Sequence, residues 1–351
     1  MTDQDPTDDA RPPDGRQWTE PGAHPVAPGV HRIPLPLPMD GLRAVNVYVL
    51  ETDDGLTLID GGWAIDESRT LLEKSLAELD RGLADITRFL VTHVHRDHYT
   101  QAVTVRREFG SHVSLGLGDK PTLDLILEPG ASTADPHVRM LREAGAKRIA
   151  DGWEKFSADA RPDLSQWEYP DAWLDGDHRI PVGGRVLDAV HTPGHTQGHY
   201  VFADHTAGLL FAGDHVLPRI TPSIGFEPVL ADQPLGDFLG SLAKVRAMPD
   251  LTLLPAHGPV APSVHARVDE LVAHHDQRLD HCREAVQAEP GTAYDVARRL
   301  TWTRHEHALD DLDLFNAALA TLETRAHLEL LVARGEMRTS PADGGPAYTL
   351  A

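Results

Sequence analysis

Four side chains that can bind a metal ion, His93, His95, Asp97 and His98, fall within six consecutive positions. They follow an apolar run at 89–91 that predicts a strand. Because a strand points alternate side chains to the same face, His93 and His95 can point together, and a turn after them lets Asp97 and His98 come alongside. A polar loop with chance histidines is the ordinary alternative, but this tight spacing favours a metal site. One loop could therefore supply ligands to two neighbouring ions.

Three more candidate ligands lie after other apolar runs. His195, Asp214 and His257 each end a predicted strand and each lie beside a glycine or a proline. Such residues form the tight turns that bring backbone and ligand close to an ion. Layered folds build sites from several strand ends, so these three side chains are expected to join the loop at 93–98.

The donor set and the single cysteine define the chemistry. Imidazole nitrogens and carboxylate oxygens suit Zn²⁺ and also accept Mn²⁺ or Fe²⁺, and two Zn²⁺ per chain are predicted. Cys282 is the only cysteine, which excludes a thiolate cage and an internal disulfide. Two ions about 3.5–4 Å apart can hold a shared water as hydroxide for attack on a carbonyl or phosphoryl group. Asp97 can orient that hydroxide and accept its proton, so the sequence predicts a hydrolase.

Composition limits the partners. The 351 residues are 41% apolar, enough for a buried core, and 32 basic against 54 acidic side chains give a net charge of −22. This charge argues against nucleic acid or an anionic membrane as the partner and favours a small-molecule substrate. No apolar run is long enough for a membrane span and no export signal is visible, so a cytoplasmic protein is expected. A homodimer is possible, although no interface is visible.

Short apolar, β-branched runs alternate with helical stretches between residues 26 and 262, which are predicted to form the catalytic domain. Residues 1–25, rich in Pro, Asp and Gly, are predicted to be a flexible leader. Residues 120–177 depart from the alternation and are predicted to be an insertion over a strand edge or a cleft. Eight strands are predicted, at 44–50, 56–59, 89–92, 113–117, 185–190, 200–202, 209–211 and 251–254. Helices are predicted at 64–80 and 234–247.

Residues 263–351 have a different sequence pattern. Three helical patterns are followed by a possible hairpin, which is the order of a winged helix, and Thr292 can cap the second helix. A DNA-binding or partner-binding role is the alternative, but acidic residues outnumber basic ones in the third helix, which favours a packed cap. His274, His275 and His281 are explained by polar helix faces, with a second metal site as the less favoured alternative.

The motifs together resemble the metallo-β-lactamase-fold hydrolases, because H-x-H-x-D-H, Gly-His, Gly-Asp and His-Gly come in that family's order. The resemblance covers about residues 30–262 and implies an α+β fold, a four-layer αβ/βα sandwich, with the winged-helix-like region after it. It implies that one metal ion is held by His93, His95 and His195. It implies that the second is held by Asp97, His98 and His257. Asp214 would bridge the two ions, and Asp60 would orient a ligand without binding metal; a plain turn aspartate is the alternative for Asp60.

Within this family the chain is most similar to the glyoxalase II-type and β-lactamase-like protein 2 branches. The resemblance favours a small ester, thioester or lactone as substrate. Single-stranded RNA is the first alternative, since the second branch includes RNA-cleaving enzymes, but the charge opposes it and only 43 positions separate Asp214 from His257. Hydrolysis of β-lactams is the second alternative. His215, Pro222 and Ile224 are predicted to contact substrate, and the aromatic side chains of the insertion are predicted either to form the pocket wall or to anchor the insertion.

Overall fold

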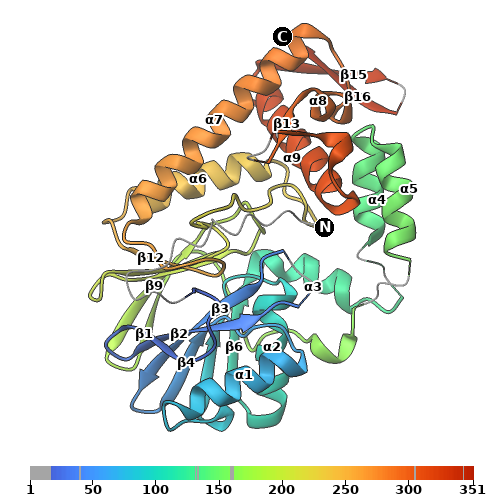
Figure 1. The fold of residues 1–351 in the computed structure, drawn as a ribbon. Helices are drawn as coiled ribbons and strands as arrows, with labels where there is room; N and C mark the ends of the chain where they lie inside the picture. Colours follow the sequence, from blue (N-terminus) through green and yellow to red (C-terminus); the bar gives the residue numbers. More distant parts are fainter. Residues whose placement is uncertain are drawn as a thin grey trace.

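The computed structural model describes residues 17–38, 41–130, 132, 134–158, 162–303, 306–342 and 344–351. Two mixed β-sheets face each other and helices cover their outer faces (Figure 1), so the predicted α+β class and four-layer sandwich are confirmed. No helix among these residues is both long and apolar enough to cross a membrane.

The first sheet has seven strands in sequence order. They are β1 (His24–Ala27), β2 (Val30–Pro36), β3 (Ala44–Thr52), β4 (Gly55–Ile59), β5 (Ile86–Leu90), β6 (His112–Gly116) and β7 (Ala172–Leu174). The strands β1 to β4 pair antiparallel, and β4 to β7 pair parallel. Parallel neighbours need crossover connections, and α1 (Asp66–Ala77) and α2 (Arg96–Phe109) lie in two of them.

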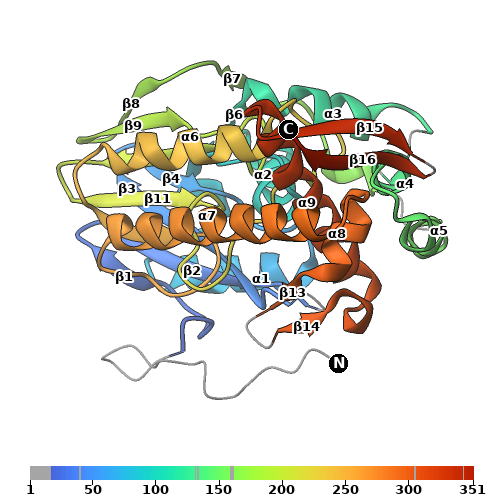
Figure 2. The same ribbon diagram turned by 90° about the horizontal axis from the view of Figure 1, so that it is seen from above.

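The second sheet has five strands in the order β12-β11-β10-β9-β8. They are β8 (His178–Val182), β9 (Arg185–His191), β10 (Tyr200–Asp204), β11 (Leu209–Gly213) and β12 (Thr252–Pro255). The pair β11 and β12 is parallel and the others are antiparallel. The helix between β11 and β12 is α6 (Pro234–Arg246), and α7 (Val264–Ala288) lies beside it over the sheet (Figure 2).

Three apolar layers hold the sandwich together. Side chains such as Tyr48, Phe202 and Phe211 fill the space between the sheets. The first sheet packs its other face on α1, α2 and α3 (Lys120–Leu127), and the second packs on α6 and α7. Full burial of each large apolar side chain contributes about 1.5–3 kcal/mol, so the two sheets form a rigid support for the loops at their ends.

The insertion and the C-terminal region pack against each other. The insertion contributes α4 (Ala134–Glu143), α5 (Lys147–Phe156) and β7, and α4 and α5 contact α9 (Leu314–Ala333). The remaining elements are α8 (Ala293–Arg299), the hairpin β13 (Thr301–Trp302) and β14 (His307–Ala308), the hairpin β15 (Met337–Ala342) and β16 (Gly345–Leu350), and the short 3₁₀ turns η2 (Leu83–Asp85), η3 (Leu117–Asp119), η4 (Leu164–Gln166) and η5 (Leu309–Asp311). The winged-helix assignment stays a prediction.

Each of the eight predicted strands overlaps an observed strand, whereas β1, β2, β7, β8, β13 and β14 were not predicted. Two prolines in β2 and the short length of β7 hide them from a pattern search. Residues 1–16 of the predicted leader lie outside the described residues. The part of the leader that is described is ordered by contacts with the first sheet. Trp18 is buried, and Arg32 of β2 donates a hydrogen bond to its carbonyl oxygen. The strand β1 begins at His24.

A close backbone crossing joins the end of β6 to the loop that carries His195. A Cβ atom on Gly116 would lie 1.9 Å from the carbonyl oxygen of Gly198, so only glycine fits there. We therefore expect Gly116→Ala to lower the free energy of unfolding by about 1–3 kcal/mol in a urea titration, because the two backbones must move apart.

Gly240→Ala is the matched control. Gly240 is exposed within α6 and a Cβ there meets no atom within 4 Å, so alanine should raise stability by up to about 1 kcal/mol. Equal stability of Gly116→Ala and wild type would show that the crossing does not constrain the fold.

Candidate metal centre

Strand ends from both sheets bring the seven candidate ligands to one place, where they form two groups of donor atoms. Within each group the donor atoms lie within 4.8 Å of one another. The first group is His93, His95, His195 and Asp214. The second group is Asp97, His98 and His257. These are the two sets that the resemblance implies, and we call them the first and second ligand groups.

Asp214 lies between the groups. Its Oδ2 is 3.5 Å from Nε2 of His195 in the first group. Its Oδ1 is 3.4 Å from Nε2 of His257 and 3.7 Å from Nε2 of His98 in the second. The carboxylate therefore offers one oxygen to each group, as the bridging role requires.

In the first group every histidine donates one ring N–H to an oxygen. His93 Nδ1 contacts Thr92 Oγ1 at 3.0 Å, and His195 Nδ1 contacts the Ser223 carbonyl at 2.9 Å. His95 Nε2 contacts the Glu227 carboxylate at 2.6 Å. These bonds select the tautomers and leave one lone pair on each ring for the centre.

The second group is held in the same way. His98 Nδ1 donates to Asp60 Oδ2 at 2.9 Å, and His257 Nδ1 donates to the Ala44 carbonyl at 2.8 Å. Asp60 also accepts the backbone N–H of Thr92 at 2.7 Å. The structure thus places Asp60 against a ligand histidine and the ligand loop, where its predicted role would put it.

The donor atoms fit metal ions. The Nδ1 atom of His95 is 2.9 Å from Nε2 of His93 and 3.2 Å from Nε2 of His195, although each carries a lone pair in the tautomers above. Asp214 Oδ1 and His257 Nε2 are buried and make no hydrogen bond within the described part of the chain. Lone pairs that face each other without a proton repel, and a cation between them removes the conflict.

The electrostatics keep Asp214 ionised. Burial alone would raise the pKa of its carboxyl group, but the nearby His257 and His98 rings hold that pKa well below its usual value. In the absence of metal these two rings carry protons of their own, because the surrounding carboxylates raise their pKa values to about 9 despite burial. An ionised carboxylate is the state that binds a metal.

Glu227 was not predicted from the sequence. Its carboxylate is buried and accepts the N–H of His95, and the attraction of that ring outweighs burial and lowers the Glu227 pKa. No ligand motif surrounds Glu227 in the sequence, so its position alone does not mark it as part of the site. Its contact orients His95 and raises the basicity of its ligand nitrogen.

Asp119 was also missed. Its buried carboxylate accepts the backbone N–H of Val94 at 2.9 Å and that of Gly198 at 2.7 Å, so it ties the ligand loop of the first sheet to the His195 loop of the second. Burial and the neighbouring Glu227 raise the Asp119 pKa to about 7. Only the tertiary structure brings these loops together, so no local pattern reveals this contact.

Two histidines beside the ligands in sequence have no place in either group. His199 Nε2 accepts the backbone N–H of Asp214 at 3.1 Å, and a Cβ on Gly213 would lie 2.6 Å from that nitrogen. His199 therefore fixes the backbone of the bridging residue. His215 is fully buried against Phe238, with ring centroids 5.1 Å apart. Its role in substrate contact stays a prediction.

The loop around residues 220–226 lies next to the first group, since Ser223 accepts the bond from His195. Pro222 and Ile224 on either side of it are both buried, and their substrate contact also stays a prediction. Phe226 contacts His137 and Trp153 of the insertion, with ring centroids 4.5 and 5.5 Å apart. The insertion thus packs on the loop that carries Glu227.

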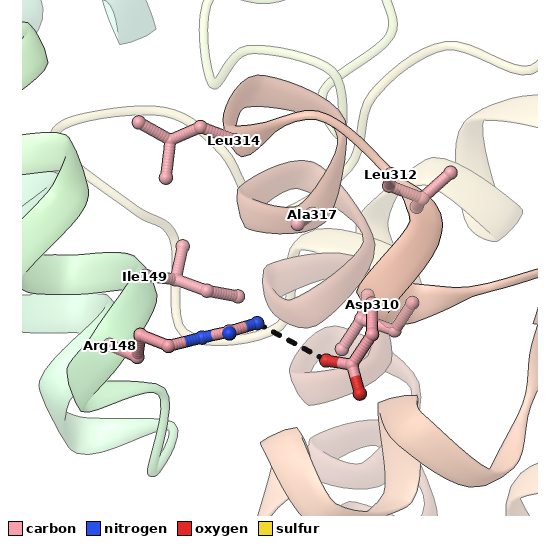
Figure 3. Close-up of a pocket in the computed structure, with 7 residues that line it drawn as sticks. Arg148, Ile149, Asp310, Leu312, Leu314 and Ala317 are labelled. Atoms are coloured by element: carbon pink, nitrogen blue, oxygen red, sulfur yellow. Dashed lines mark hydrogen bonds and ion pairs between the residues drawn. The ribbon is translucent and has the colours of Figure 1, made fainter.

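A hollow of about 220 Å³ lies between α5 and the segment that leads into α9 (Figure 3). Arg148 and Asp310 form an ion pair of 3.3 Å across it, and the other lining residues are apolar. None of the seven ligands lines this hollow, so it belongs to the junction of the insertion and the C-terminal region.

Comparisons with known proteins agree with this geometry. Probable metallo-hydrolase YqjP of Bacillus subtilis is 26% identical over 327 residues, which cover 90% of this chain and 95% of that protein. The β-lactamase-like protein 2 homolog of Caenorhabditis elegans is 25% identical and covers 78% of this chain and 77% of its own length. An atrochrysone carboxyl ACP thioesterase of Paecilomyces divaricatus is 24% identical and covers 70% of this chain and 60% of its own.

Solved structures share the whole architecture. A metallo-β-lactamase family protein of Thermus thermophilus is 26% identical with a TM-score of 0.76 and covers 93% of this chain and 100% of its own. A β-lactamase domain protein of Burkholderia ambifaria is 27% identical with a TM-score of 0.73 and covers 97% and 98%. The family model described as the metallo-β-lactamase superfamily matches residues 40–257, which include all seven candidate ligands. The chain therefore belongs to the metallo-β-lactamase superfamily and is a hydrolase of it.

Proposed function

We propose that the protein is a dinuclear zinc hydrolase of small esters, thioesters or lactones. The observation that carries the proposal is the position of Asp214, whose two carboxylate oxygens face different ligand groups. A carboxylate with one oxygen toward each group can hold two ions close enough to act on one water molecule. Mn²⁺ or Fe²⁺ could replace zinc at the same nitrogen and oxygen donors.

When bound, the two ions lower the pKa of a water molecule and draw electrons from the substrate carbonyl. The side chains do the rest. Asp97 turns Oδ2 toward His257 and His98, at 3.4 and 3.5 Å, which leaves Oδ1 to orient the water and take its proton. Water adds its oxygen to the carbonyl carbon, the bond to the alcohol or thiol breaks, and the proton passes from Asp97 to the leaving group.

Two observations support an acyl substrate over RNA. The net charge of −22 repels a polyanion, and one relative that covers 70% of this chain is named as a thioesterase. Single-stranded RNA, the first alternative from the sequence, is included in the test below. A cytoplasmic location and a homodimer stay predictions.

Removal of the bridge should abolish hydrolysis. We expect Asp214→Ala and His257→Ala to bind at least one zinc ion fewer per chain and to lose at least about 100-fold in kcat/KM, because charge stabilisation at the centre is lost. Elemental analysis and thioester hydrolysis measure the two effects. His112→Ala, at an exposed histidine, is the control. The same zinc content as wild type, together with full turnover, in Asp214→Ala would contradict the proposal.

A substrate panel tests the acyl preference. Zinc-loaded protein should hydrolyse simple thioesters or lactones at least tenfold faster than single-stranded RNA or a β-lactam, and Asp214→Ala should remove that activity. Cleavage of RNA that depends on Asp214, with thioesters and lactones left intact, would replace the acyl proposal by the nuclease alternative.

Glu227 should raise the zinc affinity of the first ligand group. Glu227→Gln keeps the shape of the side chain but removes the charge that faces His95, so zinc affinity should fall about 10–100-fold in a competition titration with a chromophoric chelator. Glu67→Gln, at an exposed position of α1, is the matched control and should bind zinc like the wild type. Unchanged affinity in Glu227→Gln would show that its contact with His95 does not affect the metal.

A further inference from the structure

A second cluster of ligand-type side chains lies where α7 packs against α9, apart from the two ligand groups. His274 and His275 come from α7 and Glu323 comes from α9. One donor atom from each of the three lies within 4.8 Å of the others. Phe238 lies between this cluster and the hydrolytic centre, because its ring contacts both His275 and His215.

A chain of hydrogen bonds leaves a free lone pair on His275. His327 Nδ1 donates to the carbonyl oxygen of Glu323 at 2.8 Å, so its Nε2 is an acceptor in the neutral ring. His275 Nδ1, 3.1 Å from that Nε2, must then donate to it. The remaining nitrogen, His275 Nε2, is fully buried and has no hydrogen-bond partner among the described residues. A buried acceptor without a donor is costly unless a cation binds it.

The other two donors supply charge and access. No hydrogen bond or ion pair of the Glu323 carboxylate is found within the described ranges, where only its backbone carbonyl accepts a bond, from His327 Nδ1. Of the two cationic side chains of α7 that act on His274, Arg267 donates to the Leu217 carbonyl at 2.6 Å, and Arg278 is also directed elsewhere. It donates to the Thr301 carbonyl at 3.0 Å and lies 4.2 Å from the Trp302 ring centroid. His274 and Glu323 are both partly exposed, which gives an ion a path from solvent.

We propose that His274, His275 and Glu323 bind a divalent cation, Zn²⁺ by preference, which fastens α7 to α9. Two imidazoles and one carboxylate are a common zinc donor set, and a water molecule completes four-coordination on the exposed side. The ion would tie the two helices together without joining the hydrolytic reaction, because none of its three ligands belongs to either ligand group. The site does not depend on the proposed hydrolytic function.

The test compares zinc content and thermal stability of full-length variants. His275→Gln and Glu323→Gln remove ligand atoms from the two helices, and His281→Gln, on the same helix outside the cluster, is the control. After equilibration with Zn²⁺ and gel filtration, each ligand variant should hold one zinc ion fewer per chain than wild type. The control should match wild type. Zinc should also raise the melting temperature of wild type and control more than that of the ligand variants.

Equal zinc content in wild type and Glu323→Gln would overturn the proposal. This variant alters a partly exposed side chain, so it decides the matter if His275→Gln does not fold, and circular dichroism checks the fold of each protein. The quantity compared is the difference in zinc content per chain between wild type and each variant, and not the total zinc content. If the hydrolytic centre held no zinc, wild type would still exceed the variants by one ion, so the two proposals can fail separately.

Discussion

The structure depends on one buried carboxylate that stays ionised between two sets of imidazoles. Asp214 lies inside the protein, where an isolated charge is costly, and the surrounding rings lower its pKa despite burial. In the first ligand group, His95 directs one ring nitrogen at His93 and His195, whose own N–H groups are already bonded to oxygens. A cation at the centre relieves the repulsion between these nitrogens, so the arrangement favours the charged species that the proposed chemistry needs.

The hydrogen-bond acceptors that orient the candidate histidine ligands are placed as definitely as the histidines themselves. A carboxylate, a hydroxyl or a backbone carbonyl accepts the outward N–H of each of the five ligand histidines. Two of these acceptors, Ala44 and Ser223, are main-chain carbonyls on segments far from the histidines that they contact. The geometry of the centre therefore depends on the packing of whole loops, which the sandwich supports on both sides.

The convergence of the seven candidate ligands on one place could be predicted from the sequence. The ligands lie in short motifs at strand ends, where apolar runs, glycines and spacing give strong local signals. Glu227 and Asp119 could not be predicted, because only the tertiary structure brings each of them close to its partner. Glu227 contacts His95, which is 132 positions away in the chain, and Asp119 contacts Val94, which is 25 positions away. The strands β2 and β7 were missed for a different reason, since prolines and short length weaken the alternation on which prediction depends.

The ligands come from loops at the ends of strands in both sheets, so any ion that binds them also cross-links the two halves of the sandwich. Binding free energy is then added directly to the free energy of folding, and it grows with the logarithm of free ion concentration. A chelator that removes the ions therefore lowers the free energy of unfolding of such a molecule. The lifetime of the folded chain in a cell would therefore follow the local supply of metal, even when no substrate is present.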